Sequence, residues 1–347
     1  MESKEIKKKL FSLFLVAMLI VTLLPDNVGM AEAMTLKQPG SAKIKQKTGK
    51  LKSYKKKGKT YYSKYKYLEY SWKKVSGVSG YEVYRYGEAS KQWYKVKTTS
   101  KKVTTYAIPE VDKGMTVQLK VRSYKNTGNG KIYSDFSPVK KYKSKKEYWL
   151  HGIQKPGKYN KKEKFWNAPK QKKGHYRFLS EYAFVIQNKY RAEKGVAPLT
   201  WNNDIYEMAK IRSKEISKKY DHTRPNGKGC DTVMLDYIKA NRKNSIYLAE
   251  LIKLHSCAEN ISADETSAVE AMKGWKKSSG HYANILSKDD AFGAISVYVD
   301  KYENYTWDSL FMMAYDPKKG QAAKIKQELN LTNYDNDKQV NLSTTTE

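Results

Sequence analysis

The stretch Trp275-Lys-Lys-Ser-Ser-Gly-His-Tyr-Ala-Asn-Ile-Leu286 decides how the C-terminal half of this chain folds. From Thr266 to Trp275, apolar side chains recur at helical spacing. Gly280 then interrupts the helical pattern immediately before His281, as glycine does at many helix ends. The sequence therefore predicts that His281 follows the end of a helix, where its imidazole can serve a functional site.

Two earlier stretches each offer one more polar side chain for the same site. His222 opens the segment His222-Thr-Arg-Pro-Asn-Gly227, in which proline and glycine prevent a helix from continuing. Glu259 lies in the segment Cys257-Ala-Glu-Asn-Ile-Ser262. We expect the rest of the domain to act as a scaffold that brings His222, Glu259 and His281 together.

Helical patterns and a terminal hairpin surround these stretches. Asn203 is a good cap for one of the helices, and Asp264 is the predicted cap of the helix that leads to Trp275. The predicted elements are helices from Phe178, near Asn203 and from Thr266, a helical run at Leu248–Leu254, and a hairpin of Ala291–Val299 and Tyr305–Tyr315. Helices followed by a hairpin predict an α+β domain over residues 178–316.

The order and spacing of four motifs resemble the CAP superfamily, also called the SCP or cysteine-rich secretory, antigen 5 and pathogenesis-related domain. The motifs are Leu199-Thr-Trp-Asn202, His222-Thr-Arg-Pro-Asn-Gly227, Ala258-Glu-Asn-Ile261 and Trp275–Leu286. The resemblance implies an α-β-α sandwich with a cleft in which histidines and acids face one another, sometimes around a divalent metal. It assigns His222, Glu259, His281 and Asn284 to this cleft. A second acid found in eukaryotic members would fall at Ser278.

The three polar residues could hold a metal. Two neutral imidazoles and a carboxylate are a credible zinc set, so His222, His281 and Glu259 are candidate ligands for Zn²⁺ or another divalent metal. Such a site leaves a position for an acidified water, which would make Glu259 the candidate catalytic base. The alternative is a metal-free, hydrogen-bonded cluster that ties three loops together. Both interpretations are open at the level of sequence, because no short motif such as His-Glu-x-x-His fixes the ligands.

The chain has two cysteines, Cys230 and Cys257, and each lies near one of the site motifs. In an exported protein they can form one disulfide that fastens two segments of the cleft. Two buried free thiols are the alternative. Three other histidines, His151, His175 and His255, have no motif around them, and we expect them on the surface.

The N-terminal half has the alternating pattern of strands. Leu68, Tyr70 and Trp72 point to one side of a strand, and the same alternation recurs at Tyr81–Tyr86 and Thr116–Arg122. Short strands separated by glycine turns predict a small antiparallel sandwich. The segments Trp72-Lys-Lys-Val-Ser-Gly77, Gly80-Tyr-Glu-Val-Tyr-Arg85, Val117-Gln-Leu-Lys-Val-Arg122 and Tyr133-Ser-Asp-Phe-Ser137 resemble a fibronectin type III domain. The resemblance covers residues 40–143 and implies a spacer or binding module.

The remaining segments concern export and connection. Residues 1–33 carry a basic region, an apolar run from Leu10 to Leu24 and the small-x-small site Ala31-Glu-Ala33, which together predict a cleaved signal peptide. The run is about 15 residues, and about 20 are needed to span a bilayer, so an uncleaved anchor is the weaker interpretation. Residues 144–177 form a basic linker, and residues 317–347 form a polar tail. We expect no transmembrane segment after cleavage.

The charge is divided very unevenly along the chain. Residues 34–177 contain 39 Lys and Arg against 8 acids, whereas residues 178–347 contain 24 against 23. A field of that size favours anionic polymers or surfaces and should depend strongly on salt. A solvated face that only keeps the protein soluble is the alternative. Basic residues among aromatics also occur in nucleic-acid grooves, but no reader motif is present, so nucleic acid is an unlikely partner.

These observations lead to one main functional hypothesis and two alternatives. The main hypothesis is a secreted protein, associated with the cell wall, that acts by binding or adhesion, with its basic module attached to an anionic cell-wall polymer or extracellular matrix. The first alternative is a metal-dependent hydrolase that uses His222, Glu259 and His281. The second, implied only by the resemblance, is capture of a small apolar ligand such as a lipid or sterol.

Overall fold

The computed structural model describes residues 35–40, 42–56, 59–148, 173–241, 257–313 and 340–341. The chain divides into two compact units, residues 1–36 and 37–347, and the fold below belongs to the second. The predicted signal peptide, the helical run at Leu248–Leu254, His151 and His255 all lie outside the described residues. Among the described helices, none has the length and apolar character needed to cross a membrane.

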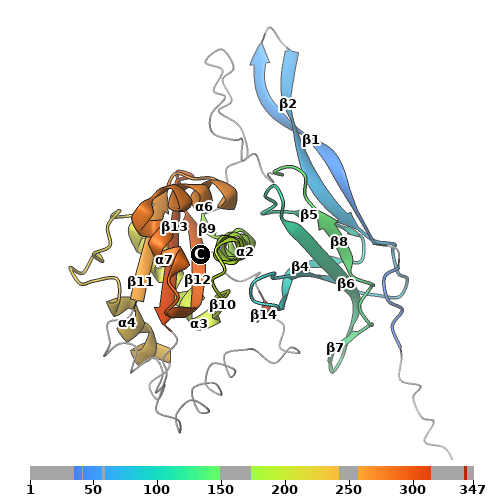
Figure 1. The fold of residues 1–347 in the computed structure, drawn as a ribbon. Coiled ribbons are helices and arrows are strands. Elements are labelled where there is room, and N and C mark those ends of the chain that lie inside the picture. The colour runs from blue at the N-terminus through green and yellow to red at the C-terminus, as the bar shows by residue number, and fades with distance from the viewer. Residues whose placement is uncertain are drawn as a thin grey trace, which may run out of the picture. The chain divides into compact units, whose positions relative to one another are not determined.

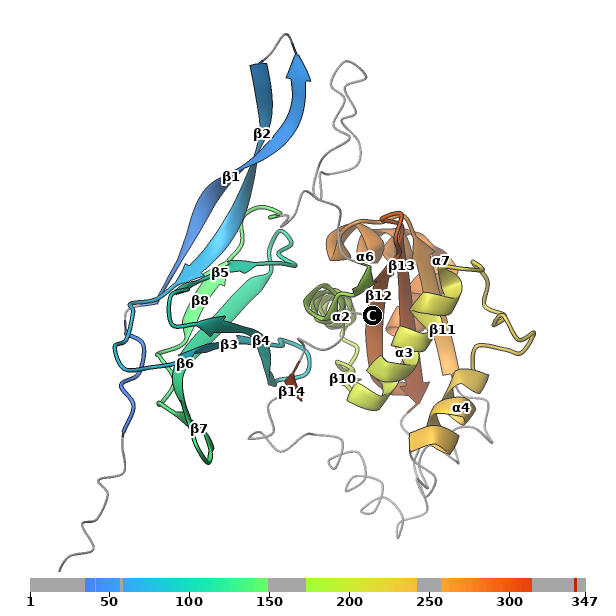
Figure 2. The same ribbon diagram turned by 180° about the vertical axis from the view of Figure 1, so that it is seen from behind.

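The N-terminal part of this unit consists of two β-sheets (Figures 1 and 2). The first has the order β1-β2-β5, and the second has the order β14-β4-β3-β6-β7, with β8 also paired to β6. All pairs are antiparallel except that of β14 with β4. The strands are β1 (Lys43–Lys56), β2 (Lys59–Ser71), β3 (Gly80–Tyr86), β4 (Trp93–Ser100), β5 (Thr105–Ile108), β6 (Thr116–Thr127), β7 (Gly130–Tyr133), β8 (Lys140–Lys143) and β14 (Val340–Asn341).

The core of this β region follows the alternation read from the sequence. Leu68, Tyr70 and Trp72 are buried together, as predicted. On β6, Val117, Leu119 and Val121 are buried, and each has more exposed neighbours on both sides. Because successive side chains of a strand point to opposite faces, one face of each sheet builds a shared apolar core.

The C-terminal part is a mixed sheet covered by helices on both faces. Its strand order is β10-β12-β13-β11, with β9 paired to β12. In Figure 1 helices α6 and α7 lie in front of this sheet, and in Figure 2 helices α3 and α4 do. The elements are β9 (Gly174–His175), α2 (Arg177–Glu193), β10 (Thr200–Trp201), α3 (Asn203–Ile216), α4 (Thr232–Asn241), β11 (Cys257–Ala263), α6 (Ala268–Lys277), α7 (Ser279–Leu286), β12 (Asp290–Val299) and β13 (Tyr305–Met313).

The predicted hairpin and helices are present, with shifted boundaries. Asn202 rather than Asn203 caps α3, because its side chain accepts hydrogen bonds from the amides of Asp204 (2.8 Å) and Ile205 (3.1 Å). Ser267 rather than Asp264 caps α6, through a 3.1 Å bond from the Glu270 amide. Both residues are of the types that satisfy free amides at a helix start, which explains why each helix begins where it does.

The prediction that the helix before His281 breaks at Gly280 was wrong. The break falls at Ser278, whose backbone is extended, and a second helix, α7, begins at Ser279. Gly280 is an ordinary residue of the first turn of that helix. Glycine lowers helix propensity by about 1 kcal/mol, which is too little to end a helix when tertiary packing holds it. Ile285 supplies that packing because it is completely buried.

The C-terminal sheet also reaches further back than the predicted domain boundary at residue 178. His175 pairs with Tyr298, and Gly174 pairs with Val299, which adds β9 to the edge of β12. His175 is only partly exposed, and its ring lies 5.0 Å from the ring of Tyr298. The expectation that His175 is a surface residue was therefore wrong.

The β region supplies hydrogen-bond acceptors to two helices of the C-terminal part. Tyr176 precedes α2 and makes no side-chain capping bond. Glu110 instead accepts bonds from the amides of Phe178 (2.7 Å) and Leu179 (3.3 Å). Asp112 accepts a 3.2 Å bond from the Val269 amide in the first turn of α6. Helix N-termini carry unpaired amides and a partial positive charge, so a carboxylate there stabilises the helix.

Candidate functional site

The structure places the three predicted site residues on three different elements. His222 lies in the connection between α3 and α4, Glu259 on β11 and His281 on α7. The His222 Nδ1 atom lies 2.8 Å from Glu259 Oε2, so the structure brings these two residues together. Burial, followed by the charge of His222, lowers the pKa of His281.

The His222–Glu259 pair joins a buried acid to an accessible imidazole. The Glu259 side chain is 1% exposed and the His222 side chain is 56% exposed. A carboxylate that accepts a bond from Nδ1 orients the ring and favours the tautomer with a free Nε2 lone pair. His222 is therefore prepared to bind a ligand at Nε2 from the solvent side.

Arg212 on α3 holds the carboxylate of Glu259 from the other side. Its Nε donates to Glu259 Oε1 at 2.7 Å, and an η nitrogen donates to Oε2 at 3.3 Å. The same guanidinium donates to the backbone oxygens of Asp221 (3.1 Å) and His222 (3.4 Å). Arg212 is completely buried, so one side chain both neutralises Glu259 and anchors the loop that carries His222.

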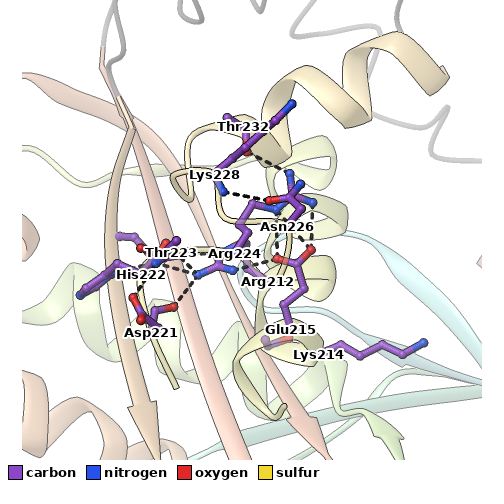
Figure 3. A network of polar contacts seen from close by, with 12 residues as sticks. Arg212, Lys214, Glu215, Asp221, His222, Thr223, Arg224, Asn226, Lys228 and Thr232 are labelled. Carbon is purple, nitrogen blue, oxygen red and sulfur yellow. Dashed lines mark hydrogen bonds and ion pairs between the residues drawn. The ribbon is translucent and has the colours of Figure 1, made fainter. Parts of the chain in front are cut away.

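A second arginine extends this network toward α4 (Figure 3). Glu215 Oε2 accepts a 2.8 Å bond from Arg212, and Glu215 Oε1 accepts a 2.8 Å bond from Arg224. Arg224 also donates to Asp236 at 2.7 Å and to the hydroxyl of Thr232 at 3.1 Å. Burial alone would raise the pKa of Glu215, but its bonds to the two arginines lower it. The loop from Asp221 to Cys230 is thus held on both sides by ion pairs.

Asn284, predicted for the cleft, ties α7 to β11. Its side-chain amide donates to Asn260 Oδ1 at 2.9 Å and makes a longer 3.5 Å bond to the backbone oxygen of Glu259. Asn260 in turn donates to the backbone oxygen of His281 at 2.9 Å. These bonds set the position of the helix turn that carries His281, so Asn284 has a positioning role.

A second acid, Asp308 on β13, lies beneath the site. It is completely buried, and neither of its carboxyl oxygens has a hydrogen-bond partner of good geometry among the described residues. Burial, followed by the negative charge of Glu259, raises the pKa of Asp308 well above its ordinary value. Asp308 therefore favours the neutral form, because two adjacent buried carboxylates resist ionising together.

Neither Arg212 nor Asp308 was assigned a role from the sequence, although each leaves a signal there. Arg212 falls on the same helix face as Ile205, Met208 and Ile216, where a charged residue needs a buried partner. Asp308 interrupts the apolar run of β13 in the same way. The sequence does not reveal which buried group each of them contacts. Ser278, the position of the missing second acid, occupies the break between α6 and α7.

The two cysteines lie close enough to the site to interact with its charges. Burial raises the pKa of the Cys230 thiol to about 12, and the charge of Glu259 adds to this effect. Burial also raises the pKa of Cys257, with the next contribution from Cys230. Both thiols are free in this structure. The disulfide therefore stays a prediction, and the raised pKa values argue against a nucleophilic role for either thiol.

The predicted set of three metal ligands does not fit this geometry. Both oxygens of Glu259 already accept charge-assisted bonds, from Arg212 and from His222. A guanidinium at 2.7 Å opposes a metal cation at the same carboxylate. In the described part of the chain, no group of three or more His, Cys, Asp or Glu side chains is arranged to hold a metal. Glu259 fits an orienting role behind His222 better than a ligand role.

Comparisons with known proteins identify the domain that carries this site. Residues 186–315 match the family model described as CAP, the cysteine-rich secretory protein family. Comparison with curated proteins finds no match.

Among solved structures, similar chains include a cysteine-rich secretory protein from Staphylococcus aureus (11% identity, TM-score 0.32, 81% of this chain and 89% of that one). An extracellular protein containing an SCP domain from Bacillus anthracis is 16% identical, with a TM-score of 0.31 over 70% of this chain and 89% of that one. An outer surface protein from Borrelia burgdorferi is 12% identical, with a TM-score of 0.31 over 39% of this chain and 92% of that one. These scores are too low to support further argument, and the assignment rests on the family model together with the motifs. Residues 186–315 of this chain form a CAP domain of the cysteine-rich secretory protein family.

Proposed function

We propose that this protein works outside the cell as a binding protein, with its basic β region attached to an anionic polymer of the cell wall. The observation that carries the proposal is the uncompensated charge of that region. Residues 34–177 contain 39 Lys and Arg but only 8 acids. The described ion pairs within the β-sheets use just two carboxylates, those of Glu69 and Glu82. Within the described part of this region, the cations therefore far outnumber the carboxylates that pair with them, and the excess charge can act on an external polyanion.

Two further features support this assignment. The N-terminal leader has the pattern of a secretory signal, which agrees with action outside the cell. The strand orders β1-β2-β5 and β4-β3-β6-β8 are those expected for a fibronectin type III-like sandwich, whose usual roles are spacing and binding. We therefore assign display and attachment to the β region and ligand contact to the CAP domain.

Retention on purified cell wall across a salt series tests the attachment. We expect the bound fraction to fall steeply between about 0.05 M and 0.5 M salt, because the Debye length shrinks from about 13 Å to about 4 Å over that range. Uncharged dextran beads serve as the control matrix and should retain little protein at any salt concentration. Retention on the wall that does not change with salt would contradict an electrostatic attachment.

A second candidate function is the binding of a divalent cation by the CAP domain. It rests on the 2.8 Å bond between His222 Nδ1 and Glu259, because metal-binding histidines are usually oriented by a carboxylate in this way. His222 and His281 would hold the cation, which could polarise a bound ligand. Glu259 is poorly suited to be a hydrolytic base because Arg212 occupies its oxygens, so the geometry favours binding over hydrolysis. Capture of an apolar ligand stays a prediction.

Zinc titration by calorimetry tests this second function. We expect the wild-type chain to take up one equivalent, and the His222→Ala, His281→Ala double variant to lose this uptake. Glu259→Gln should weaken uptake by about 10- to 100-fold through loss of ring orientation. A His175→Gln variant is the matched control, since it also removes a histidine. Equal weak uptake by the wild type and the double variant would remove the metal hypothesis.

A further inference from the structure

The outer face of the sheet formed by β4, β3, β6 and β7 carries aromatic and cationic side chains side by side. On β3, Tyr84 and Tyr86 belong to this face, while Val83 and Arg85 point to the other. Tyr86 pairs with Trp93 on β4, and Tyr84 pairs with Lys120 on β6. The face is thus built from cross-strand neighbours and not from one continuous segment.

The cations of this face lie over the aromatic rings. The Lys120 Nζ atom is 4.0 Å from the ring centre of Phe136 and 4.5 Å from that of Trp93. The Arg122 Cζ atom is 3.7 Å from the ring centre of Tyr133. Such cation–π contacts hold the long side chains in place and arrange positive charge above the sheet.

One buried acid balances only part of this charge. Glu82 is completely buried and lies 2.9 Å from Arg122, 3.5 Å from Lys95 and 3.6 Å from Lys131. Three cations therefore share a single carboxylate. Among the described residues, no carboxylate lies within ion-pair distance of the Lys120 ammonium.

Lys120 is held in an environment that disfavours its charge. Burial and the neighbouring charge of Arg122 lower its pKa. A partly buried ammonium without an acid is destabilised, and a bound anion would remove that penalty. A charge that its surroundings disfavour is a recognised mark of a functional site when geometry also supports one.

We infer that this face binds the phosphate groups of a sugar- or polyol-phosphate polymer, with Lys120 as the central contact and Arg122 and Lys131 beside it. The inference rests on the proposed attachment to an anionic polymer, and it names the surface and the chemical group. Lysine binds phosphate as a point charge and needs no planar geometry. The Lys120 ammonium, which no carboxylate of the described residues neutralises, suits one oxyanion of such a chain.

The covered rings argue against a nucleic acid as the occupant. Single-stranded nucleic acids bind by stacking their bases on exposed aromatic faces. Here the cations already occupy faces of Trp93, Phe136, Tyr133 and Tyr124. With these faces occupied, the face offers the charge of its cations, which suits a phosphate polymer without bases.

Binding to immobilised poly(glycerol phosphate), measured with the purified full chain, tests the inference. The variant is Lys120→Met, which keeps the apolar stem over the rings and removes the charge. The control is Lys102→Met, which removes the same charge from an exposed turn after β4. We expect Lys120→Met to weaken binding about fivefold and to lower the slope of log K against log salt by about one, and Lys102→Met to change the affinity less than about twofold.

The outcomes separate this inference from the broader function. Equal effects of the two variants would overturn Lys120 as the contact, while salt-dependent binding by the wild type would leave the attachment intact. No binding of this polymer by the wild type would overturn the inference, while retention on purified cell wall would still decide the broader attachment. Tighter binding to a polyuronate or to single-stranded DNA of matched length would overturn the choice of phosphate polymer. Matching thermal unfolding midpoints would show that neither variant is misfolded.

Discussion

A buried carboxylate needs a counter-charge or hydrogen-bond donors, and the CAP domain supplies these to Glu259 from two sides. Arg212 and His222 together engage both oxygens, and Asp308 nearby is pushed toward its neutral form. Without the arginine, two acids would share an apolar interior. The site is therefore built around the buried Arg212–Glu259 ion pair, beside which Asp308 favours its neutral form.

Replacing Arg212 by methionine should destabilise the protein by about 3–5 kcal/mol at pH 7, because it leaves the Glu259 carboxylate buried without its counter-charge. Urea unfolding of the wild type and the variant at pH 7 measures the difference.

A matched change elsewhere on the same helix is the control for this prediction. Glu207→Gln breaks the Lys210–Glu207 pair, whose glutamate is 44% exposed. Exposed pairs contribute about 0–1 kcal/mol, so this variant should stay close to the wild type. An Arg212→Met variant that behaves like Glu207→Gln would show that the buried pair contributes nothing to stability.

At the level of elements, the two-residue strand β9 gives the domain a pH-sensitive edge. His175 lies on this strand beside Tyr298, with its Nδ1 atom 3.3 Å from Ser296 Oγ. Burial, followed by the charges of Lys210 and Lys214, lowers the pKa of His175 to about 3. The ring is neutral in the folded protein, whereas in the unfolded chain it gains a proton near pH 6.5.

The sign of the pH effect follows from this difference. Below pH 6.5 the unfolded state binds more protons than the folded state, so stability falls as pH decreases. His175 should contribute a loss of about 1.4 kcal/mol per pH unit, or about 2 kcal/mol between pH 6.5 and 5. Urea unfolding at both pH values should show this extra loss in the wild type and not in His175→Gln. Parallel pH profiles for the two proteins would contradict it.

Local sequence patterns were sufficient to predict some of the elements. The alternation of β6 and the helical period before Trp275 placed a strand and a helix correctly, because each pattern matches the burial of a single element. The break at Ser278 and the start of α7 were not predicted, because they depend on packing of Ile285 against other elements.

Across the whole molecule, the excess positive charge and the candidate site lie in different parts of the chain. Residues 34–177 contain nearly all the excess positive charge, and residues 178–347 are nearly neutral but have several ion pairs around the loop that carries His222. This division suits a protein that attaches through one part and contacts a ligand with the other. A field spread over many lysines gives reversible, salt-dependent attachment.

The sequence by itself determined the classes of the two folded parts and three residues of the site. Periodicity and motif order were enough for this, because they record which residues face a core and where the chain must turn. Only the tertiary structure decided the partners: Arg212 and Asp308 around Glu259, and Glu82 beneath the cations of the β region. The Arg122–Glu82 and Arg212–Glu259 contacts join residues 40 and 47 positions apart, and no local pattern encodes which buried charges meet across such distances.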